Sequence, residues 1–330
     1  MKLTWELTDL DREFFERELE SFVPDRIFDV HAHLYELWQW KKPTILQGGP
    51  EKLPLERYQE EIQWITPGRE THALFFGGGL HPETYRVSNE YVAVQVAKDP
   101  DSRSLLIVSP HMDPEEVRQE VRRLSMVGLK VYQHFAPGVE TWEAEIEQFL
   151  AEEHVRIAHE EELVVLLHMV KSRALADPAN QQKIRYYCET YPGMRLILAH
   201  AGTAFNPHHT AEGIHSLKGL ANVWFDMSAI TGNGALEPIV RTFGHERLMW
   251  GSDYPISHLR GRCVSIGDSH IWLYEDTLDW SRVSYREVKP LFMGLESLRI
   301  LKVALWNLGL SDRQVEDVFW TNARKVLRLE

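Results

Sequence analysis

Cysteine is nearly absent from this chain. The 330 residues include only Cys188 and Cys263, which lie far apart and form no CxxC pair. Two isolated thiols cannot supply the disulfide framework of a secreted protein, so we expect a reducing compartment, the cytoplasm. The N-terminal stretch MKLTWELTDLDREFFERELE is acidic and amphipathic, which is not the pattern of a signal peptide.

Positive charge and long apolar runs are also scarce. Lys and Arg total 36 against 49 Asp and Glu, which gives a formal charge of −13. Such a protein is poorly suited to nucleic acid or to an anionic membrane surface. No apolar run reaches the length of a membrane span. These absences leave a small molecule as the expected partner, with no nucleic acid and no membrane.

Short apolar runs rich in β-branched residues recur along the chain, and most are followed by turn residues and a helix-like stretch. This alternation is typical of parallel strands joined by crossover helices. No GxGxxG opens a helix after any run, and eight units favour a closed (β/α)₈ barrel over an open sheet. We therefore predict one barrel domain over 1–330, with strands within 27–33, 72–79, 104–111, 128–135, 163–170, 195–202, 221–228 and 247–255.

Two segments are longer than the loops of a minimal barrel, and both should lie over the carboxyl ends of the strands. Residues 34–56 would form a long loop after the first strand, and residues 256–286 a lid loop after the eighth. We expect residues 1–26 to hold an N-terminal helix and residues 287–330 to form C-terminal helices, with Ser311 as an N-cap. Five aromatic residues in the two loops indicate a flat or apolar portion of the substrate, with packing of the lid itself as the alternative: Trp38, Trp40, Trp272, Tyr274 and Trp280.

Polar side chains gather where the predicted strands end. With 16 histidines present, the HAH of residues 31–33 is weak evidence alone. Simple alternation places Asp29, His31 and His33 on one face of the first strand, with Asp29 one step deeper as a supporting residue. Imidazole and carboxylate groups in apolar strands favour a metal, with Zn²⁺ preferred and Fe²⁺ or Mn²⁺ as competitors. The later strand ends add His168, His200, Asp226 and Asp253.

Five motifs in order give the chain a resemblance to the amidohydrolase superfamily. The branch that it resembles contains aminocarboxymuconate-semialdehyde decarboxylase. The motifs are DVHAH at 29–33, LLHM at 166–169, LILAHAG at 196–202, MWGSDYP at 249–255 and TNARKVL at 321–327.

The resemblance implies a metal site and roles for its residues. His31, His33, His168 and Asp253 would hold one divalent ion, most often zinc, with an open position for water. Asp253 would also accept a proton from that water. His200 would act as general acid/base or would stabilise an oxyanion, with second-shell packing as the alternative. Asp226 is interpreted as a loop-capping residue, with support of a ligand as the alternative.

Lys130 raises the question of a second metal. Some binuclear amidohydrolases carry a carboxylated lysine on the fourth strand, and GLKVYQHF places Lys130 on that strand. Gln133 and His134 lie nearer to the strand's end, and a lysine buried near the barrel floor is the alternative. We therefore favour one metal over two.

Several residues are candidates for contact with substrate. His81, His111 and His134 follow the second, third and fourth strands, so they should face the mouth of the barrel. A substrate carboxylate would need a cation, for which Arg is well suited. Arg173 and Arg260 are the candidates, with neighbouring Lys171 and Arg262, and surface charge is the alternative.

These residues predict a metal-dependent hydrolase that acts on an amide, lactone or ester bond of a small polar molecule, which can carry a carboxylate. Non-oxidative decarboxylation of a small carboxylic acid is the first alternative. A catalytically silent barrel that binds a ligand is the second. The resemblance also implies a homodimer.

Overall fold

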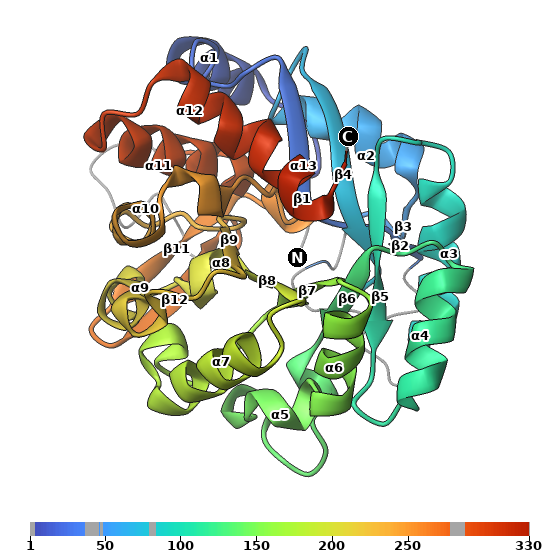
Figure 1. Ribbon diagram of the computed structural model, residues 1–330. Helices are drawn as coiled ribbons and strands as arrows, with labels where there is room; N and C mark the ends of the chain where they lie inside the picture. The colour runs from blue at the N-terminus through green and yellow to red at the C-terminus, as the bar shows by residue number, and fades with distance from the viewer. Residues whose placement is uncertain (1–3, 37–45, 47–48, 79–83, 278–287, 330) are drawn as a thin grey trace.

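Eight parallel strands form a ring in the computed structural model, which describes residues 4–36, 46, 49–78, 84–277 and 288–329 (Figure 1). Neighbours in the ring follow one another along the chain, which is the order of a (β/α)₈ barrel. The predicted fold is thereby confirmed. The strands are β1 (Arg26–His33), β4 (Glu70–Phe76), β5 (Arg103–Val108), β6 (Gly128–Val131), β7 (Val164–Leu167), β8 (Arg195–Leu198), β9 (Val223–Asp226) and β10 (Leu248–Met249).

Backbone hydrogen bonds between β1 and the segment after β10 close the ring. The amide of Val30 donates to the carbonyl of Trp250 at 3.2 Å, and the amide of Asp253 donates to the carbonyl of His31 at 2.7 Å. Gly251 makes this approach feasible, because a Cβ there would lie 3.0 Å from the Cβ of His31. The seam therefore joins the two segments that carry the HAH and GSD motifs.

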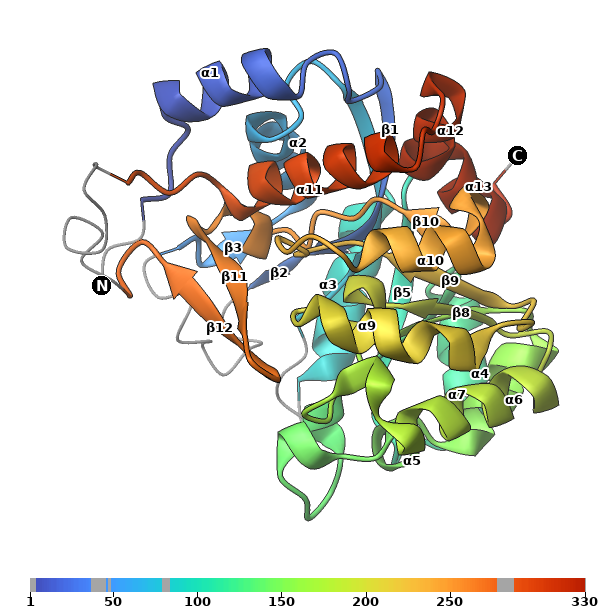
Figure 2. The same ribbon diagram turned by 90° about the vertical axis from the view of Figure 1, so that its left-hand side faces the viewer.

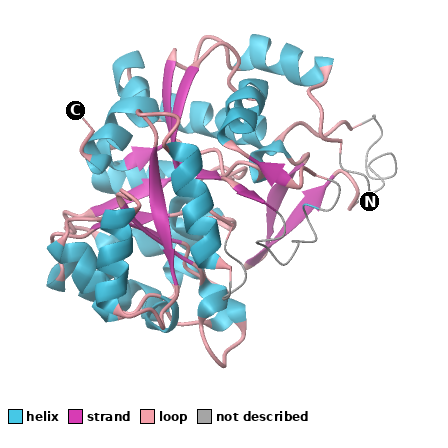
Figure 3. Cartoon of the chain, turned by 90° about the vertical axis from the view of Figure 1, so that its right-hand side faces the viewer, coloured by secondary structure: helices cyan, strands magenta, loops and turns pink. Residues whose placement is uncertain are grey.

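Helices surround the strands on the outside of the ring (Figures 2 and 3). Two of them begin at an Asp-Pro pair, in which Asp113 or Asp177 accepts hydrogen bonds from the first free amides. The α-helices are α1 (Asp9–Glu18), α2 (Leu55–Glu61), α3 (Tyr85–Val96), α4 (Pro114–Arg123), α5 (Ile146–Phe149), α6 (Glu152–Glu160), α7 (Pro178–Thr190), α8 (His200–Thr203), α9 (Pro207–Gly213), α10 (Leu236–Phe243), α11 (Met293–Asn307), α12 (Asp312–Glu316) and α13 (Asn322–Leu327).

Shorter helical turns complete the outer layer. A π-helical turn, η10 (Asp317–Thr321), joins α12 to α13. The 3₁₀ turns are η3 (Ile62–Trp64), η4 (Gln133–Phe135), η5 (Thr141–Glu143), η6 (Ala174–Ala176), η7 (Ile214–Leu217), η8 (His245–Arg247) and η9 (Ile256–His258).

Two apolar cores lie on the two faces of the barrel wall. The larger one fills the space between strands and helices. The smaller one fills the barrel interior and includes Phe28, Val30, Phe76 and Leu166. Residues of α13 belong to this inner core, so the last helix closes the amino-terminal end of the barrel. Side chains therefore fill the barrel interior at the amino-terminal end, and a cavity can form only at the carboxyl ends of the strands.

The two predicted loops contain short strands. In the first, β2 (Tyr35–Glu36) pairs with β3 (Lys52–Leu53), while Trp38 and Trp40 lie outside the described residues. In the second, β11 (Gly261–Ile266) and β12 (Ser269–Tyr274) form an antiparallel hairpin, which corrects the expectation of a plain loop. Trp280 lies outside the described residues. Both pairs project from the end of the barrel opposite to the C-terminus (Figure 2).

The hairpin lies beside the mouth of the barrel and packs on the segment that follows β8. The side chain of Asn206 donates to the carbonyls of Gly267 and Ser269, both at 3.1 Å, and so fixes the tip of the hairpin. Trp272 packs on Phe205 with ring centroids 4.9 Å apart, and Phe205 lies 5.3 Å from the ring of His200. An apolar wall therefore reaches from the hairpin to the strand ends.

The terminal segments match their expected helices. Helix α1 lies within residues 1–26, and Ser311 begins α12, where its amide donates to the side chain of Gln314. None of the helices in the described part of the chain is long and apolar enough to cross a membrane.

Candidate metal centre and active site

A β-bulge in β1 aims both histidines into the barrel. The pairing with β4 aligns Asp29 with Ala73 and Ala32 with Phe75, so β1 has one extra residue in this interval. Val30 faces the inner core before the bulge, and His31 and His33 face the pocket after it. The bulge therefore separates Asp29 from the histidines, which corrects the expectation that all three share one face.

Asp29 supports the bulge from outside the pocket. Its carboxylate accepts hydrogen bonds from the amide of His31 at 3.0 Å, the amide of Ser252 at 2.8 Å and the hydroxyl of Tyr58 at 2.9 Å. Burial raises the pKa of Asp29 to about 7, against these donors. The carboxyl group ties β1 to the segment after β10, which agrees with a supporting role.

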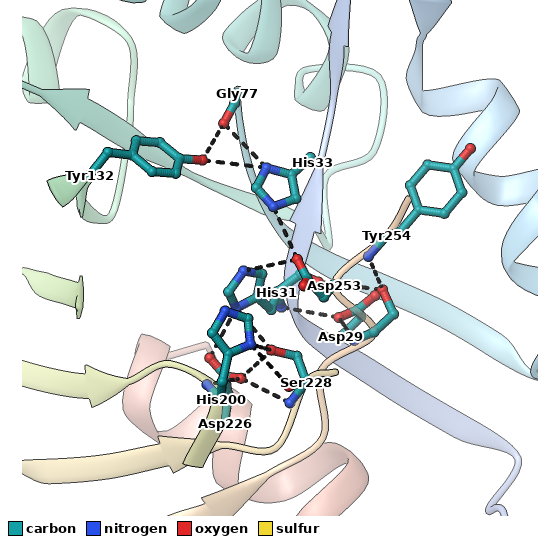
Figure 4. Close-up of polar contacts among 11 residues, drawn as sticks. Asp29, His31, His33, Gly77, Tyr132, His200, Asp226, Ser228, Asp253 and Tyr254 are labelled. Carbon is teal, nitrogen blue, oxygen red and sulfur yellow. Dashed lines mark hydrogen bonds and ion pairs between the residues drawn. The ribbon is translucent and has the colours of Figure 1, made fainter. Parts of the chain in front are cut away.

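Asp226 orients His31. Its carboxylate lies 3.0 Å from His31 Nδ1, and since a carboxylate only accepts, Nδ1 carries the hydrogen (Figure 4). The other nitrogen, Nε2, then presents a lone pair toward Asp253, 3.4 Å away. A carboxylate behind a histidine is the usual support of a metal ligand. Asp226 therefore orients His31, which was the alternative interpretation, and its other oxygen also caps the loop by accepting the amide of Ser228 at 3.0 Å.

His33 is oriented in a similar way. Its Nδ1 lies 3.3 Å from the carbonyl of Gly77 and 3.5 Å from the hydroxyl of Tyr132, while Nε2 lies 3.2 Å from Asp253. Candidate ligand atoms of His31, His33 and Asp253 all lie within 4.8 Å of one another. The three side chains thus converge on one point, as Figure 4 shows.

Ser228 links His200 to the same network. His200 Nδ1 lies 3.0 Å from the Ser228 carbonyl, which fixes the hydrogen on Nδ1. The hydroxyl of Ser228 donates to Asp226 and lies 3.0 Å from His200 Nδ1. The amide of His200 donates to Asp226 at 3.1 Å. One buried carboxylate therefore organises two imidazoles.

His168 completes the ring of histidines. Its Nε2 is buried and has no hydrogen-bond partner among the described residues, and its ring centroid lies 4.7 Å from that of His200. Burial, with His200 and Lys130 nearby, holds the pKa of His168 well below its ordinary value. A buried neutral imidazole nitrogen without a partner is costly unless a ligand binds it. His168 therefore fits a metal ligand. Its nitrogens are not among the described groups of three side chains whose ligand atoms all lie within 4.8 Å of one another.

The backbone at the site adopts an uncommon conformation. His200 and Asp253 have φ values of 54° and 58°, in the left-handed region that few residues other than glycine occupy. Such conformations persist where the surrounding structure enforces them, and they gather at functional sites. Here the hydrogen bond from the amide of Asp253 to the carbonyl of His31 holds the turn.

Burial and neighbouring charge set the protonation states. Burial lowers the pKa of His31 to about 4, so its imidazole is neutral at pH 7. Burial raises the pKa of Asp253, but the nearby imidazoles outweigh it and hold the pKa below its ordinary value. The same balance holds the pKa of Asp226 far below its ordinary value. Neutral imidazoles beside ionised carboxylates are the forms that bind a divalent metal.

These side chains line a pocket of about 240 Å³ at the carboxyl ends of the strands. This volume suits a small molecule rather than a polymer segment. Five residues predicted to bind the metal or to act in catalysis line it: His31, His33, His168, His200 and Asp253. The remaining walls come from Leu46, Gly78, Lys130, Tyr132, Gln133, His134, Pro255 and Ile256.

Lys130 faces this pocket rather than the barrel floor. It is aligned with Ile107 and Leu166 in the neighbouring strands, and its Nζ lies 4.8 Å from the centroid of Phe76. Burial lowers its pKa to about 8, against the attraction of Asp226 and Asp253.

The histidines predicted to contact substrate lie in three different situations. His134 lines the pocket, as expected for a substrate contact. His111 is exposed and is not among the residues that line it, so its predicted contact is not supported. His81 lies outside the described residues.

Neither predicted arginine reaches the pocket. Arg173 is on the surface, where it pairs with Glu212 and lies 3.8 Å from Asp268 in the hairpin. Arg260 points away from the site and is buried against Asp11, with two contacts of 3.0 and 2.7 Å. The predicted contacts of Arg173 and Arg260 with substrate are therefore wrong, because both guanidinium groups are held elsewhere by carboxylates. Lys171 likewise pairs with Glu145.

Arg260→Met should destabilise the protein without changing its affinity for substrate. Burial raises the pKa of Asp11, but Arg260 and Thr8 hold it below its ordinary value, so the substitution leaves a buried carboxylate unpaired. We expect a loss of about 3 kcal/mol in the free energy of unfolding by urea. Arg173→Met, which breaks an exposed pair, should cost less than about 1 kcal/mol. A raised KM with unchanged stability would restore Arg260 as a substrate contact.

Sequence reasoning missed three contributors to the site. Ser228 and Tyr132 act through hydrogen bonds to the histidines, and Gly77 contributes a carbonyl. Their position just beyond strands β9, β6 and β4 is the only signal that the sequence offers, and it is shared by many neutral residues. A second group, His72 with Asp99 and Asp101, lies near the start of β4, and His72 bonds Asp99 directly at 2.9 Å.

Comparison with known proteins identifies the family of the chain. The amidohydrolase family model matches residues 28–329, which is most of the chain. The L-fucono-1,5-lactonase of Burkholderia ambifaria is 27% identical over 124 residues, a stretch that covers 33% of this chain and 42% of that protein. Less than half of that relative's length is therefore matched.

Solved structures share the fold over nearly the whole chain. A Pseudomonas putida protein, provisionally described as a 2-pyrone-4,6-dicarboxylic acid hydrolase, has a TM-score of 0.59 at 18% identity and covers 93% of this chain and 99% of its own. A dihydroxybenzoic acid decarboxylase from Polaromonas sp. JS666 with bound manganese has a TM-score of 0.57 at 16% identity, with 92% and 97% covered. At these identities the likeness shows the fold alone.

Proposed function

The chain belongs to the amidohydrolase family, and from that premise we propose that it is a metal-dependent hydrolase of small molecules. The proposed ligands are His31, His33, His168 and Asp253. We propose one ion, zinc before manganese or iron, since three imidazoles and one carboxylate suit zinc best.

One observation supports the metal more than any other. The Nδ1 sides of His31, His33 and His200 each face an acceptor of the protein, so the hydrogens lie there. The buried Nε2 of His168 has no partner in the part of the chain that the structure describes. In His31 and His33, Nε2 faces the carboxylate of Asp253, and imidazoles fixed in this way are prepared for a cation rather than for one another.

The chain's own residues would carry the proton in hydrolysis. A divalent ion held here would polarise a carbonyl group and lower the pKa of water. Asp253 accepts a proton from the attacking water and returns it to the leaving oxygen or nitrogen. His200 stands beside it as general acid/base or as a donor to the carbonyl oxygen. The hairpin wall around Trp272 and Phe205 limits the entry of further water.

A lactone or another cyclic ester is the preferred substrate class. Two of the similar proteins are named for such rings: an L-fucono-1,5-lactonase, and a protein of the same fold provisionally described as a 2-pyrone-4,6-dicarboxylic acid hydrolase. The small pocket volume of about 240 Å³ agrees with a single ring and its substituents. We therefore place lactones before amides and open-chain esters.

Non-oxidative decarboxylation is the second candidate. The decarboxylases among the proteins of similar fold show that this barrel accommodates the reaction, and the amine of Lys130 supplies a cation for a carboxylate in the pocket. Release of CO₂ from aromatic carboxylates, without net addition of water, would favour it over hydrolysis.

Metal removal should lower both activity and stability. A ligand at 100 times its Kd stabilises the folded state by about 2.7 kcal/mol, so chelation should reduce the melting temperature and Zn²⁺ or Mn²⁺ should restore it. Mass spectrometry of the metal in the purified protein and a screen of lactones, esters, amides and aromatic carboxylates complete the test.

The matched control for this experiment is His111→Ala, because His111 is exposed and outside the pocket. His31→Ala should lose metal and activity, whereas His111→Ala should keep both. A protein without metal, in which His31→Ala also behaves as the wild type, would support the silent ligand-binding barrel instead.

The cellular setting and assembly are part of this proposal. Cys188 and Cys263 are both free and buried, which agrees with a reducing compartment, and we propose the cytoplasm. We also propose a homodimer, which light scattering of the purified protein would reveal as twice the mass of the chain.

A further inference from the structure

The amine of Lys130 is buried inside the pocket. The residue is 1% exposed and stands on β6 between Leu129 and Val131, whose side chains pack in the outer core. Lys130 therefore points inward, and it lines the pocket with His31 and His168. Its Nζ lies over the rings of Phe76 and Tyr132, 4.8 and 5.0 Å from their centroids.

Within the described residues, Nζ of Lys130 has no hydrogen bond and no ion pair. Asp226 and Asp253 attract it, but neither carboxylate lies within the 4.0 Å of an ion pair. A buried amine without an acceptor is destabilising, and aromatic faces replace only part of its hydration. A molecule that enters the pocket can supply the acceptor that the described residues do not.

The depth of Lys130 indicates which part of that molecule it meets. The ring of Phe76 packs against both metal-site histidines, 4.9 Å from His31 and 4.5 Å from His33 between centroids. Nζ lies over this same ring. It is thus level with the candidate metal ligands, so a substrate bound at these ligands would bring its reacting carbon near Nζ rather than a remote substituent.

We propose that Lys130 is a catalytic residue that donates an N–H hydrogen bond to the carbonyl oxygen of the substrate. This inference rests on the proposed hydrolase function and adds a residue to it. The acceptor is an oxygen bonded to the carbon under attack, so the substrate class is a lactone or ester whose carbonyl points down into the barrel.

The bond changes show when this contact matters. The oxygen of water forms a bond to the carbonyl carbon, and the π electron pair moves onto the carbonyl oxygen, which becomes an oxyanion. The hydrogen bond from Lys130 strengthens as this charge grows. When the pair returns, the bond to the leaving oxygen breaks, and that oxygen takes the proton which Asp253 removed from water. Lys130 ends unchanged.

Lys130→Met is the direct test, because methionine keeps the contact with the aromatic rings and removes the donor. We expect kcat to fall by about 10²- to 10³-fold with little change in KM. Lys130→Gln, which restores an N–H, should recover part of the rate. Thermal stability of Lys130→Met should equal or exceed that of the wild type, since the unpartnered buried amine is gone.

Lys183→Met is the matched control. Lys183 also lies over two aromatic rings, those of Tyr186 and Tyr187 at 5.4 and 5.3 Å, but it is outside the pocket. The Lys183→Met substitution should therefore leave kcat unchanged. A wild-type kcat in Lys130→Met would overturn the proposal. A higher KM at constant kcat would also overturn it, because Lys130 would then bind a substrate carboxylate that is remote from the reacting carbon. Loss of bound metal would mean that Lys130 serves the metal instead.

A binding measurement separates this proposal from the hydrolase function. Methylphosphonate has the tetrahedral shape and negative oxygen of the hydrolytic intermediate, and calorimetry can follow it in metal-loaded protein without turnover. It should bind Lys130→Met about 10- to 100-fold more weakly than the wild type, as for loss of a charged hydrogen bond. Equal affinities would overturn the role of Lys130 even in an active enzyme. If the wild type is inactive but still binds methylphosphonate more tightly than Lys130→Met does, only the hydrolase function is contradicted.

Discussion

Asp253→Asn is expected to lower kcat by about 10³-fold while the protein stays folded. Asp253 lies 3.4 Å from His31 and 3.2 Å from His33, and it is the only carboxylate of the described residues that lines the pocket. The amide of asparagine cannot accept the proton of the attacking water. The measurement is steady-state hydrolysis at saturating metal, because the substitution also weakens a proposed ligand.

Asparagine is the appropriate replacement because of the backbone. Asp253 occupies the left-handed region at φ 58°, which asparagine tolerates better than alanine does. The hydrogen bond from the backbone amide of residue 253 to the carbonyl of His31 is therefore retained. A circular dichroism spectrum equal to that of the wild type should confirm that the fold is unchanged. An active Asp253→Asn variant with full metal content would exclude Asp253 as the base.

The pH dependence of the wild type has a defined direction. The pKa of Asp253 lies below its ordinary value, so the base is ionised at neutral pH and activity is lost only as pH falls through that lowered pKa. Asp253→Asn should lack this acidic limb in its residual rate.

Asp226→Asn is expected to weaken metal binding by about 10- to 100-fold, and to destabilise the metal-free protein by about 3–5 kcal/mol. The carboxylate is fully buried and accepts hydrogen bonds from His31, His200 and Ser228. An amide nitrogen in its place would face a donor at His31 Nδ1. The imidazole would then lose its fixed tautomer, or the new amide would stay unpaired.

Metal titration by calorimetry and urea unfolding of the metal-free protein are the two measurements. Ser228→Ala is the matched control, because it removes one donor to Asp226 and leaves the contact between Asp226 and His31 intact, so its effects should be smaller. The pKa of Asp226 is lowered, so its stabilisation is present above the unfolded pKa and lost only in strong acid. Unchanged metal affinity in Asp226→Asn would contradict an orienting role.

The convergence of the site was predictable because a barrel brings strand ends together. His168 and Asp253 are far apart in sequence, yet both were placed correctly at the mouth from the strand pattern alone. Apolar runs report strand positions directly, since each strand is buried on both faces. The histidines proposed as metal ligands follow from this register and the motifs around them.

Register within β1 was not predictable. Alternation assigns Asp29 to the face of His31, but a bulge adds one residue between Asp29 and Ala32. Bulges depend on pairing with the neighbouring strand, and here the carboxylate of Asp29 stabilises the bulge itself by accepting the amide of His31. A single sequence carries no mark of such a pairing.

Charge was the weakest guide to substrate contacts. Arg260 and Arg173 follow strand ends in the sequence, but a positive charge in an acidic protein readily finds a carboxylate nearby. For Lys130, the sequence indicates only a bridge between metals or a place at the barrel floor. Its direction depends on which face of β6 points inward, and the structure shows Lys130 alternating with Leu129 and Val131 of the outer core.

The seam of the barrel has a consequence for the order in which the molecule folds. Strand β1 emerges first from the ribosome, whereas Asp253 follows it 220 residues behind His33. Such distant contacts form late, because the intervening chain must be ordered before they can. A nascent chain therefore carries its histidines unassembled until the ring closes between His31 and Asp253. Catalysis becomes available only once the whole barrel is complete, so no partly folded chain can act on substrate.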